Sequence, residues 1–336
     1  MESLATKYRP QTFEDVVGQE SIIKILNNQI SNNAIKQGYL FTGGAGTGKT
    51  TIARIFAKQI NGSHNGIIEI DAASNNGVDN VREIRENVKF KPIGAKYKIY
   101  IIDEVHMLST GAFNALLKTL EEPPAHAIFI LATTDPQKIP ATILSRVQRF
   151  DFKRMTIEQT IDRLNYIIQQ EQKLITPEAV EYIAKLAQGG MRAAISILDT
   201  ILSYGDNINI DDVMEIMGTS SHDDYLKLVS FIAQKDFGSM IELIEDLHIR
   251  GKDLKLFILG FAEFIVDSMK FDLLGNFDYT NIPPVYQERV QRFIKFTNEN
   301  NINLIKWFEK LNQLHLDIKY ESNPKPLIQG GLMLIA

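Results

Sequence analysis

The most constraining feature of this sequence is the segment GGAGTGKT at residues 43–50. The apolar run at residues 39–42 predicts a strand before it, and the apolar spacing of residues 52–58 predicts a helix after it. A glycine-rich loop between a strand and a helix is the context of a P-loop, whose backbone N–H groups surround phosphates. The segment therefore predicts a protein that binds a nucleoside triphosphate.

The residue types in this loop predict how the nucleotide would be held. The amine of Lys49 would reach the β- and γ-phosphates, and the hydroxyl of Thr50 would coordinate Mg²⁺. The loop residues expected to contact the nucleotide are Gly43, Gly46, Thr47, Gly48, Lys49, Thr50 and Thr51.

The segment ahead of the first predicted helix contains an aromatic residue, a cation and small apolar residues. Two alternatives stay open for it: an N-terminal arm packed on the core, or an apolar wall of an adenine pocket. The residues concerned are Tyr8, Arg9, Val17 and Gly18.

Four further apolar segments alternate with helical patterns and predict strands at residues 67–71, 98–102, 128–132 and 148–152. Strands that are apolar throughout and alternate with helices predict an α/β fold, with a parallel sheet covered on both faces. Ligands of such sheets bind at the carboxyl ends of the strands. The P-loop, Asp103, Glu104 and Thr134 all follow strands directly, so we expect them at one edge.

These residues predict the chemistry of hydrolysis. Asp103 would lie near Mg²⁺ and hold a metal-bound water, and Glu104 would orient and deprotonate the attacking water. Thr134 would contact the γ-phosphate or that water. Arg146 and Arg192 are candidates for the positive charge that phosphoryl transfer needs, although each arginine alone is also compatible with a surface salt bridge.

Composition narrows the class of protein. A chain of 336 residues predicts two or three domains, and the absence of cysteine excludes disulfides and thiolate metal sites. No apolar run approaches the roughly 18 residues that span a membrane, and the N-terminus has no signal-peptide pattern, so we expect a cytoplasmic protein.

Residues 1–152 carry 17 basic and 15 acidic side chains, whereas the overall net charge is −5. Any DNA surface is therefore expected on the first part of the chain.

Several longer motifs resemble one family, the gamma/tau subunits of bacterial DNA polymerase III. These motifs are KYRP at 7–10, VGQ at 17–19, DAAS at 71–74, DEVHMLS at 103–109, FNALLKTLEEPP at 113–124 and ATTDPQKIP at 132–140. The resemblance is strong over residues 1 to about 205. Members of this family are AAA+ clamp loaders, which use ATP to open a ring-shaped sliding clamp and place it on primed DNA.

The resemblance implies roles for single residues and for partners. Lys49 and Thr50 would bind ATP and Mg²⁺, Thr134 would be the first sensor, and Arg192 would be the second sensor in the lid domain. Arg146 would be the arginine finger that reaches the ATP of a neighbouring subunit. The implied partners are a sliding clamp, primer–template DNA and other clamp-loader subunits, with which a helical collar forms a pentameric ring.

Two departures from the family pattern affect metal and DNA. Relatives carry a four-cysteine zinc module where this chain has only residues 61–66, and His64 alone cannot hold zinc. We therefore expect no zinc. Val147 replaces the cysteine that follows the finger arginine.

Basic residues that meet DNA phosphates in relatives are also missing here, and the candidates for DNA contact are Arg82, Asn76 and Ser109. A solvated helix face is an equally good interpretation of the basic residues in this region.

The expected architecture is an AAA+ P-loop domain at residues 1–153, a small helical lid at 154–218 and an all-α collar at 219–336, with a linker at 218–221. The chain ends without the extended tail of the tau form, so polymerase and helicase tethering are not expected. Two alternatives to a clamp-loader motor are a nonhydrolysing structural subunit of the same ring and another AAA+ DNA motor, such as a branch-migration helicase. Damage to the P-loop or the acids would favour the first alternative, and the sequence shows none.

Overall fold

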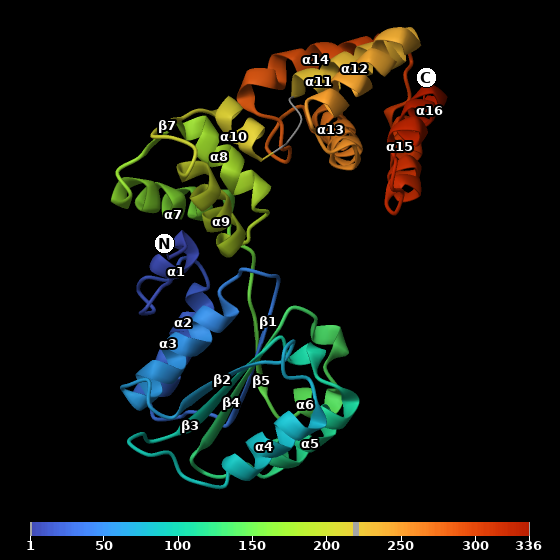
Figure 1. Cartoon of the computed structure of the whole chain (residues 1–336). Helices are drawn as coiled ribbons and strands as arrows, with labels where there is room; N and C mark the ends of the chain where they lie inside the picture. The colour runs from blue at the N-terminus through green and yellow to red at the C-terminus, as the bar shows by residue number, and fades with distance from the viewer. Residues whose placement is uncertain (1, 218–221, 336) are drawn as a thin grey trace. The chain divides into compact units, whose positions relative to one another are not determined.

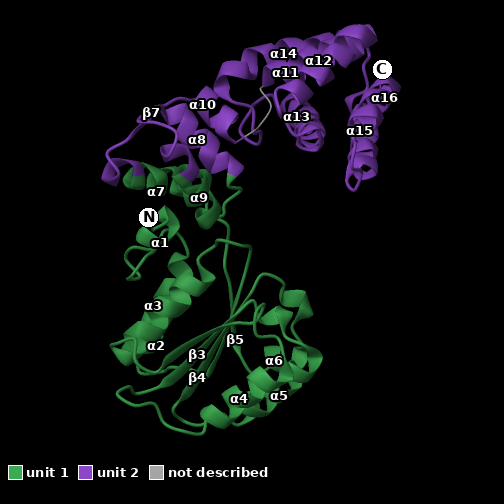
Figure 2. Cartoon of the chain, in the orientation of Figure 1, with its two compact units in different colours: residues 1–167, 187–199 green, residues 168–186, 200–336 purple. Residues whose placement is uncertain are grey.

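The computed structural model describes residues 2–217 and 222–335, and the expected linker at 218–221 lies outside them. The chain divides into two compact units (Figure 2). Unit 1 comprises Met1–Ile167 with Ala187–Asp199, and unit 2 comprises Ile168–Leu186 with Thr200–Ala336. The expected lid at 154–218 contributes to both units, and the division into three domains stays a prediction.

Unit 1 contains a five-stranded sheet of order β2-β3-β4-β1-β5, in which every pairing is parallel. The strands are β1 (Gly38–Thr42), β2 (Ile67–Asp71), β3 (Lys98–Asp103), β4 (Ala127–Thr133) and β5 (Gln148–Asp151). All residues of β1 and β4 are buried, as expected for central strands covered on both faces. The α/β fold with a parallel sheet, which the sequence predicts, is confirmed.

Helices cover both faces of this sheet (Figure 1). Four of them are α2 (Glu20–Ser31), α3 (Lys49–Asn61), α4 (Val78–Asn87) and α5 (Thr110–Glu121). Because side chains alternate along a strand, Tyr39 and Phe41 of β1 pack with residues of α2 and α3, while Leu40 packs with residues of α4 and α5. Each face of the sheet therefore has its own apolar core.

Short elements follow two of the strands: one comes after β3, and two lie between β4 and β5. They are η1 (Val105–Met107), η2 (Pro136–Lys138) and α6 (Ala141–Leu144). The register pairs Thr42 with Thr133 and Asp71 with Asp103, so neighbouring strands end level with one another. This edge brings together loops that are far apart in the sequence.

Unit 1 also contains α1 (Leu4–Lys7), most of α7 (Ile157–Gln170) and the first part of α9 (Met191–Leu202). Hydrogen bonds join α7 and α9 to the N-terminal segment. Arg163 of α7 donates to the carbonyl of Tyr8 at 2.7 Å, and the Leu4 amide donates to Asp199 of α9 at 3.1 Å. The chain thus returns to unit 1 after an excursion through unit 2.

Unit 2 is helical except for a two-residue parallel pairing of β6 (Leu174–Ile175) with β7 (Asn207–Ile208). Its helices are α8 (Pro177–Leu186), α10 (Ile210–Ile216), α11 (His222–Gln234), α12 (Phe237–Ile249), α13 (Leu254–Leu274), α14 (Pro284–Glu299), α15 (Leu304–Ile318) and α16 (Lys325–Ile335). Phe257, Phe261 and Phe264 of α13 are buried, so these rings form part of the helix-packing core. Among the described helices, none is long and apolar enough to cross a membrane.

Candidate active site

The P-loop joins β1 to α3, and its glycines are required by its backbone. Gly43, Gly46 and Gly48 have φ values of 148°, 73° and 98°, a region that other residues rarely adopt. A Cβ atom on Gly43 would also lie 2.6 Å from the carbonyl oxygen of Phe152. The loop therefore holds its shape only with glycine at these positions.

A cavity of about 240 Å³ lies against this loop, and all of its lining comes from unit 1. Of the residues that the sequence predicts for nucleotide contact or catalysis, those that line it are Tyr8, Arg9, Val17, Gly46, Thr47, Gly48, Lys49, Thr50, Thr51, Asp103, Glu104 and Arg192. Gly18, Gly43, Thr134 and Arg146 do not line it. A Cβ on Gly18 would meet Met155, which is itself a lining residue. The lining residues that sequence reasoning missed are Ala5, Pro10, Asp15, Val16, Ala45, Met155, Arg163, Met191 and Ile195.

Thr50 and Asp103 form a direct pair. The hydroxyl of Thr50 donates to Oδ2 of Asp103 at 2.6 Å, although the two residues are 53 positions apart. Oδ1 of Asp103 accepts the backbone N–H of Glu104 at 3.0 Å. A hydroxyl and a carboxylate side by side supply the oxygen ligands that Mg²⁺ takes in nucleotide sites, where phosphates and waters complete its coordination. These residues therefore fit the expected magnesium ion.

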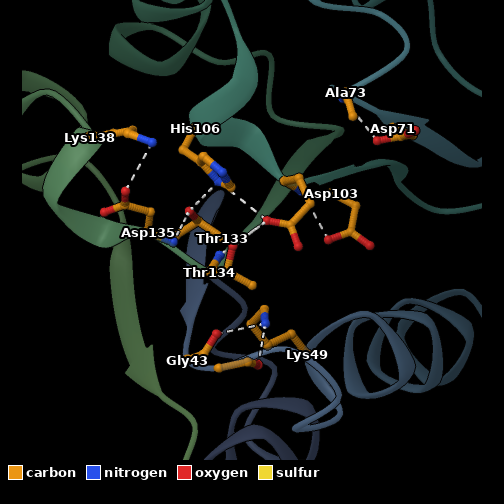
Figure 3. A network of polar contacts seen from close by, with 12 residues as sticks. Gly43, Lys49, Asp71, Ala73, Asp103, His106, Thr133, Thr134, Asp135 and Lys138 are labelled. Carbon is orange, nitrogen blue, oxygen red and sulfur yellow. Dashed lines mark hydrogen bonds and ion pairs between the residues drawn. The ribbon is translucent and has the colours of Figure 1, made fainter. Parts of the chain in front are cut away.

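Lys49 lies at the base of the cavity and is only 5% exposed. Its Nζ donates to the carbonyl oxygens of Gly43 and Gly44, at 2.8 Å each (Figure 3). Burial lowers the pKa of Lys49, and the nearby carboxylates of Glu104 and Asp103 oppose that shift. Phosphate oxygens would be stronger acceptors for this amine than the two neutral carbonyls.

Glu104 has a left-handed backbone, with φ of 46°. Its Oε2 accepts from the hydroxyl of Thr134 at 2.9 Å and from the amide of the same residue at 3.2 Å. Thr134 thus contacts the carboxylate itself, a partner that sequence reasoning did not assign to it. The two hydrogen bonds fix one oxygen of Glu104 beside the end of β4.

A polar network that the sequence did not predict joins His106, Thr133, Asp135 and Lys138 (Figure 3). Nδ1 of His106 lies 2.9 Å from Oγ1 of Thr133 and 3.3 Å from Oε2 of Glu104. Oγ1 of Thr133 accepts the Asp135 amide at 3.0 Å, and Asp135 forms an ion pair with Lys138 at 3.2 Å. The histidine two residues after Glu104, in the DEVH motif at 103–106, was the available signal.

The two predicted arginines lie at different places. Arg192 is near the start of α9 and lines the P-loop cavity, where the neighbouring Met191 amide donates to the Gly46 carbonyl at 3.1 Å. Arg146 instead lines a second cavity with Gly38 and Gln148, which begin β1 and β5. Its guanidinium pairs with Glu121 at 2.8 Å. Arg146 therefore lies at the amino edge of the sheet, opposite its own P-loop.

The candidates for DNA contact lie at the start of α4 and α5. The carbonyl of Asn76 accepts the Ser109 amide at 3.1 Å, which joins the loops that precede the two helices. The hydroxyl of Ser109 caps α5 by accepting from the Ala112 amide at 3.2 Å. Arg82 lies on the exposed side of α4 and pairs with Asp79 at 2.9 Å.

A parallel sheet with a P-loop, an acidic pair after β3, a polar residue after β4 and an arginine returning on α9 define a AAA+ P-loop ATPase. The comparisons with known proteins then narrow the class. Residues 18–77 and 60–156 match the family model of the DNA polymerase III delta subunit, and residues 159–207 match the ATPase lid domain of the DNA polymerase III clamp loader subunit.

Named relatives give the family. The chain is 34% identical to DNA polymerase III subunit gamma of Buchnera aphidicola from Acyrthosiphon pisum, over 99% of this chain and 98% of that protein. It is 41% identical to subunit tau of Bacillus subtilis, over 99% of this chain and 63% of that protein, and 42% identical to subunit tau of Escherichia coli, over 74% and 42%. The chain belongs to the bacterial DNA polymerase III gamma/tau family, and it spans 63% and 42% of the lengths of these two tau proteins.

Solved structures support the fold alone. The Thermotoga maritima RuvB Holliday junction branch migration motor matches with a TM-score of 0.53 and 22% identity, over 67% of this chain and 79% of that one. This likeness agrees with the AAA+ architecture of the sheet and its P-loop.

Proposed function

We propose that this chain is an ATP-hydrolysing motor subunit of a clamp loader, which opens a sliding clamp and places it on primer–template DNA during replication. Membership of the gamma/tau family supports the biological setting. The observation that carries hydrolysis is the convergence of Lys49, Thr50, Asp103 and Glu104 on one cavity. A nonhydrolysing structural subunit would not need this complete set.

The nucleotide proposed for the cavity is ATP. The aromatic ring of Tyr8 and the apolar side chains of Val16, Val17, Met155 and Ile195 also line the cavity. Apolar walls of this kind suit a purine base. This lining favours the adenine-pocket interpretation of the N-terminal segment, and Gly18 acts there as a backbone turn against Met155.

Hydrolysis is proposed to depend on five side chains, and a sixth is proposed to sense the nucleotide. Lys49 would neutralise the β- and γ-phosphates, and Thr50 with Asp103 would hold Mg²⁺, which withdraws charge from the phosphate oxygens when bound. Glu104 would accept a proton from the attacking water, and Thr134 would keep its carboxylate in place. Arg192 would report the triphosphate to the segment that begins at α9.

We propose that Arg146 acts on the ATP of a neighbouring subunit. The five residues of β1 separate Gly38, beside Arg146, from the P-loop, a span on the order of 13 Å. A finger that cannot reach its own site makes hydrolysis conditional on assembly, as in other enzymes that supply an arginine in trans. A pentameric ring with other clamp-loader subunits, built through the C-terminal helices, would provide the neighbour.

DNA is proposed to lie against the joined starts of α4 and α5. Two adjacent helix N-termini present unpaired backbone N–H groups and partial positive charge, which suit phosphate oxygens. Asn76, Ser109 and Arg82 are the side chains available there. Residues 1–152 carry a net positive charge, which also favours contact with DNA phosphates.

We propose that residues 1–153, 154–218 and 219–336 act as ATPase, lid and collar domains. We also propose that the protein holds no zinc and does not contact a membrane. Bacterial DNA replication takes place in the cytoplasm, which is therefore the proposed location.

The test is reconstitution with a sliding clamp, partner subunits and primed circular DNA. We expect ATP-dependent retention of the clamp on the DNA, lost with Glu104→Gln. ATP-independent activity of that variant would favour a structural subunit. Strand displacement on branched DNA without any clamp would favour a branch-migration motor instead.

A further inference from the structure

Beside the proposed base lies a histidine that no step of the proposed function uses. His106 belongs to η1, two residues after Glu104, and its side chain is only 10% exposed. Its Nδ1 faces two oxygens, Oγ1 of Thr133 at 2.9 Å and Oε2 of Glu104 at 3.3 Å (Figure 3). A buried polar ring in this position needs a physical reason.

The surroundings of Nδ1 determine which ring nitrogen carries the proton. An ionised carboxylate only accepts hydrogen bonds, so a bare nitrogen lone pair 3.3 Å from Oε2 of Glu104 would be repelled. Oγ1 of Thr133 already accepts the Asp135 amide and has a second lone pair available. The ring therefore carries its proton on Nδ1, donates it to Oγ1 of Thr133 and holds partial positive charge 3.3 Å from Oε2 of Glu104.

We propose that His106 is a positioning residue that keeps the carboxylate of Glu104 in the orientation needed for hydrolysis. This inference rests on the proposed role of Glu104 as the base. Its Oε2 accepts the hydroxyl and the amide of Thr134 and lies 3.3 Å from Nδ1 of His106, whereas Oε1 accepts no hydrogen bond from the part of the chain that the structure describes. One oxygen is anchored, and the other is left for the attacking water.

Anchoring matters because Glu104 is 34% exposed and has three rotatable side-chain bonds. Without the donor from η1, the carboxylate would turn about its contact with Thr134 and populate orientations that do not face the γ-phosphate. Displacements of about 1 Å in a catalytic group reduce turnover by roughly 10²-fold.

The experiment compares His106→Asn, His106→Gln and His106→Leu. The amide nitrogen of asparagine can occupy the position of Nδ1, that of glutamine lies one bond further out, and leucine offers no donor. We expect the affinity of all three for a fluorescent ATP analogue to stay within about threefold of the unmodified chain. In the complex assembled with partner subunits, we expect kcat to fall about 10- to 100-fold for leucine and glutamine. Asparagine should restore most of it, and KM should change little.

His126→Leu is the matched control, since His126 is also in unit 1 but bonds the Val88 carbonyl at 2.9 Å, away from the cavity. Normal turnover of the leucine or glutamine variant overturns the inference, and so does an asparagine variant as slow as leucine. If the leucine variant fails to bind nucleotide, the comparison of asparagine with glutamine still decides. Glu104→Gln separates the two proposals: an active Glu104→Gln overturns the base itself, whereas an inactive one beside an active His106→Leu overturns only the role of His106.

Discussion

Among single residues, Lys49 and Glu104 line the same cavity but serve different steps. Lys49→Ala removes the buried cation that faces the triphosphate, so we expect ATP affinity to fall about 100-fold or more. Glu104→Gln keeps the shape of the site without its base, so we expect nearly normal binding and a fall in turnover of about 10²- to 10⁴-fold. Titration with a fluorescent ATP analogue and single-turnover hydrolysis in the assembled complex separate the two. A glutamine variant that hydrolyses ATP at the normal rate contradicts the assignment of the base.

The sequence predicted the site residues that belong to contiguous motifs. Lys49 and Thr50 lie within one loop, and Asp103 directly follows an apolar strand, so local order was enough to bring them together. The contacts of Glu104 were not predictable in this way, because its left-handed backbone and the turn of η1 decide which side chains face it. The ion pair of Arg146 with Glu121 likewise depends on how α5 and α6 pack, which no local pattern shows.

At the scale of elements, one side-chain amide, that of Asn61, closes the short loop at residues 61–66. This loop stands at the place of the zinc module in the family pattern. Asn61, at the end of α3, donates to the carbonyls of Asn65 and Tyr97 at 2.9 and 2.8 Å, and it accepts the Tyr97 amide at 3.0 Å. These bonds connect the loop to the start of β3. The sequence lacks the cysteines that would bind zinc, but it could not indicate that the side-chain amide of Asn61 connects this loop to β3.

We expect Asn61→Ala to destabilise unit 1 by about 1–3 kcal/mol, because a partly buried side chain loses three hydrogen bonds. We also expect a chelator to leave the melting temperature of the unmodified chain unchanged, with no stoichiometric zinc in metal analysis. Asn65→Ala is the control, since its side chain is not part of these bonds. One tightly held zinc per chain, or an unchanged Asn61→Ala, contradicts the account.

The helix α11 carries a titratable group that makes unit 2 sensitive to acid. His222 is 8% exposed and stacks on Tyr286 with ring centroids 5.0 Å apart, and its Nδ1 has no hydrogen-bond partner among the described residues 2–217 and 222–335. Burial lowers the pKa of His222 to about 4, and Asp223 opposes the shift. Because the unfolded chain binds a proton near pH 6.5 and the folded chain does not, stability is lost as the pH falls from 6.5 towards 4.

Between pH 7 and pH 5, we expect this group to reduce the free energy of unfolding by about 2 kcal/mol. Urea unfolding followed by circular dichroism at the two pH values measures the difference. His222→Phe keeps an aromatic ring against Tyr286 and should remove that part of the pH dependence. An identical pH dependence in this variant would show that other groups cause the loss.

For the whole molecule, chain order alone did not predict which segments fold together. No local pattern indicated that residues 168–186 belong to unit 2 while residues 187–199 return to unit 1. This return brings Arg192 to the P-loop cavity, 143 positions after Lys49 in the chain, and only tertiary packing decides it. Long apolar strands and helices were predictable because periodicity is local, whereas the partition of the helical segments depends on contacts between distant helices.

The place of Arg146 at the amino edge of the sheet predicts that its side chain acts on the ATP of another subunit in the assembled ring. Arg146→Ala should bind ATP nearly normally as an isolated chain, because its own cavity is intact. In the assembled ring we expect turnover to fall on the order of 10³-fold, because each neighbouring ATP loses its finger.

Mixing Arg146→Ala chains with Lys49→Ala chains makes this test sharper. In a mixed ring, a subunit with an intact P-loop receives the intact Arg146 of a Lys49→Ala neighbour, so part of the ATPase activity should return, although neither variant is active alone. Crosslinking or native mass spectrometry would establish that mixed rings form. If they form and no activity returns, Arg146 does not act on a neighbour, and its pairing with Glu121 is structural. Recovered activity would require that the site and its finger come from different chains.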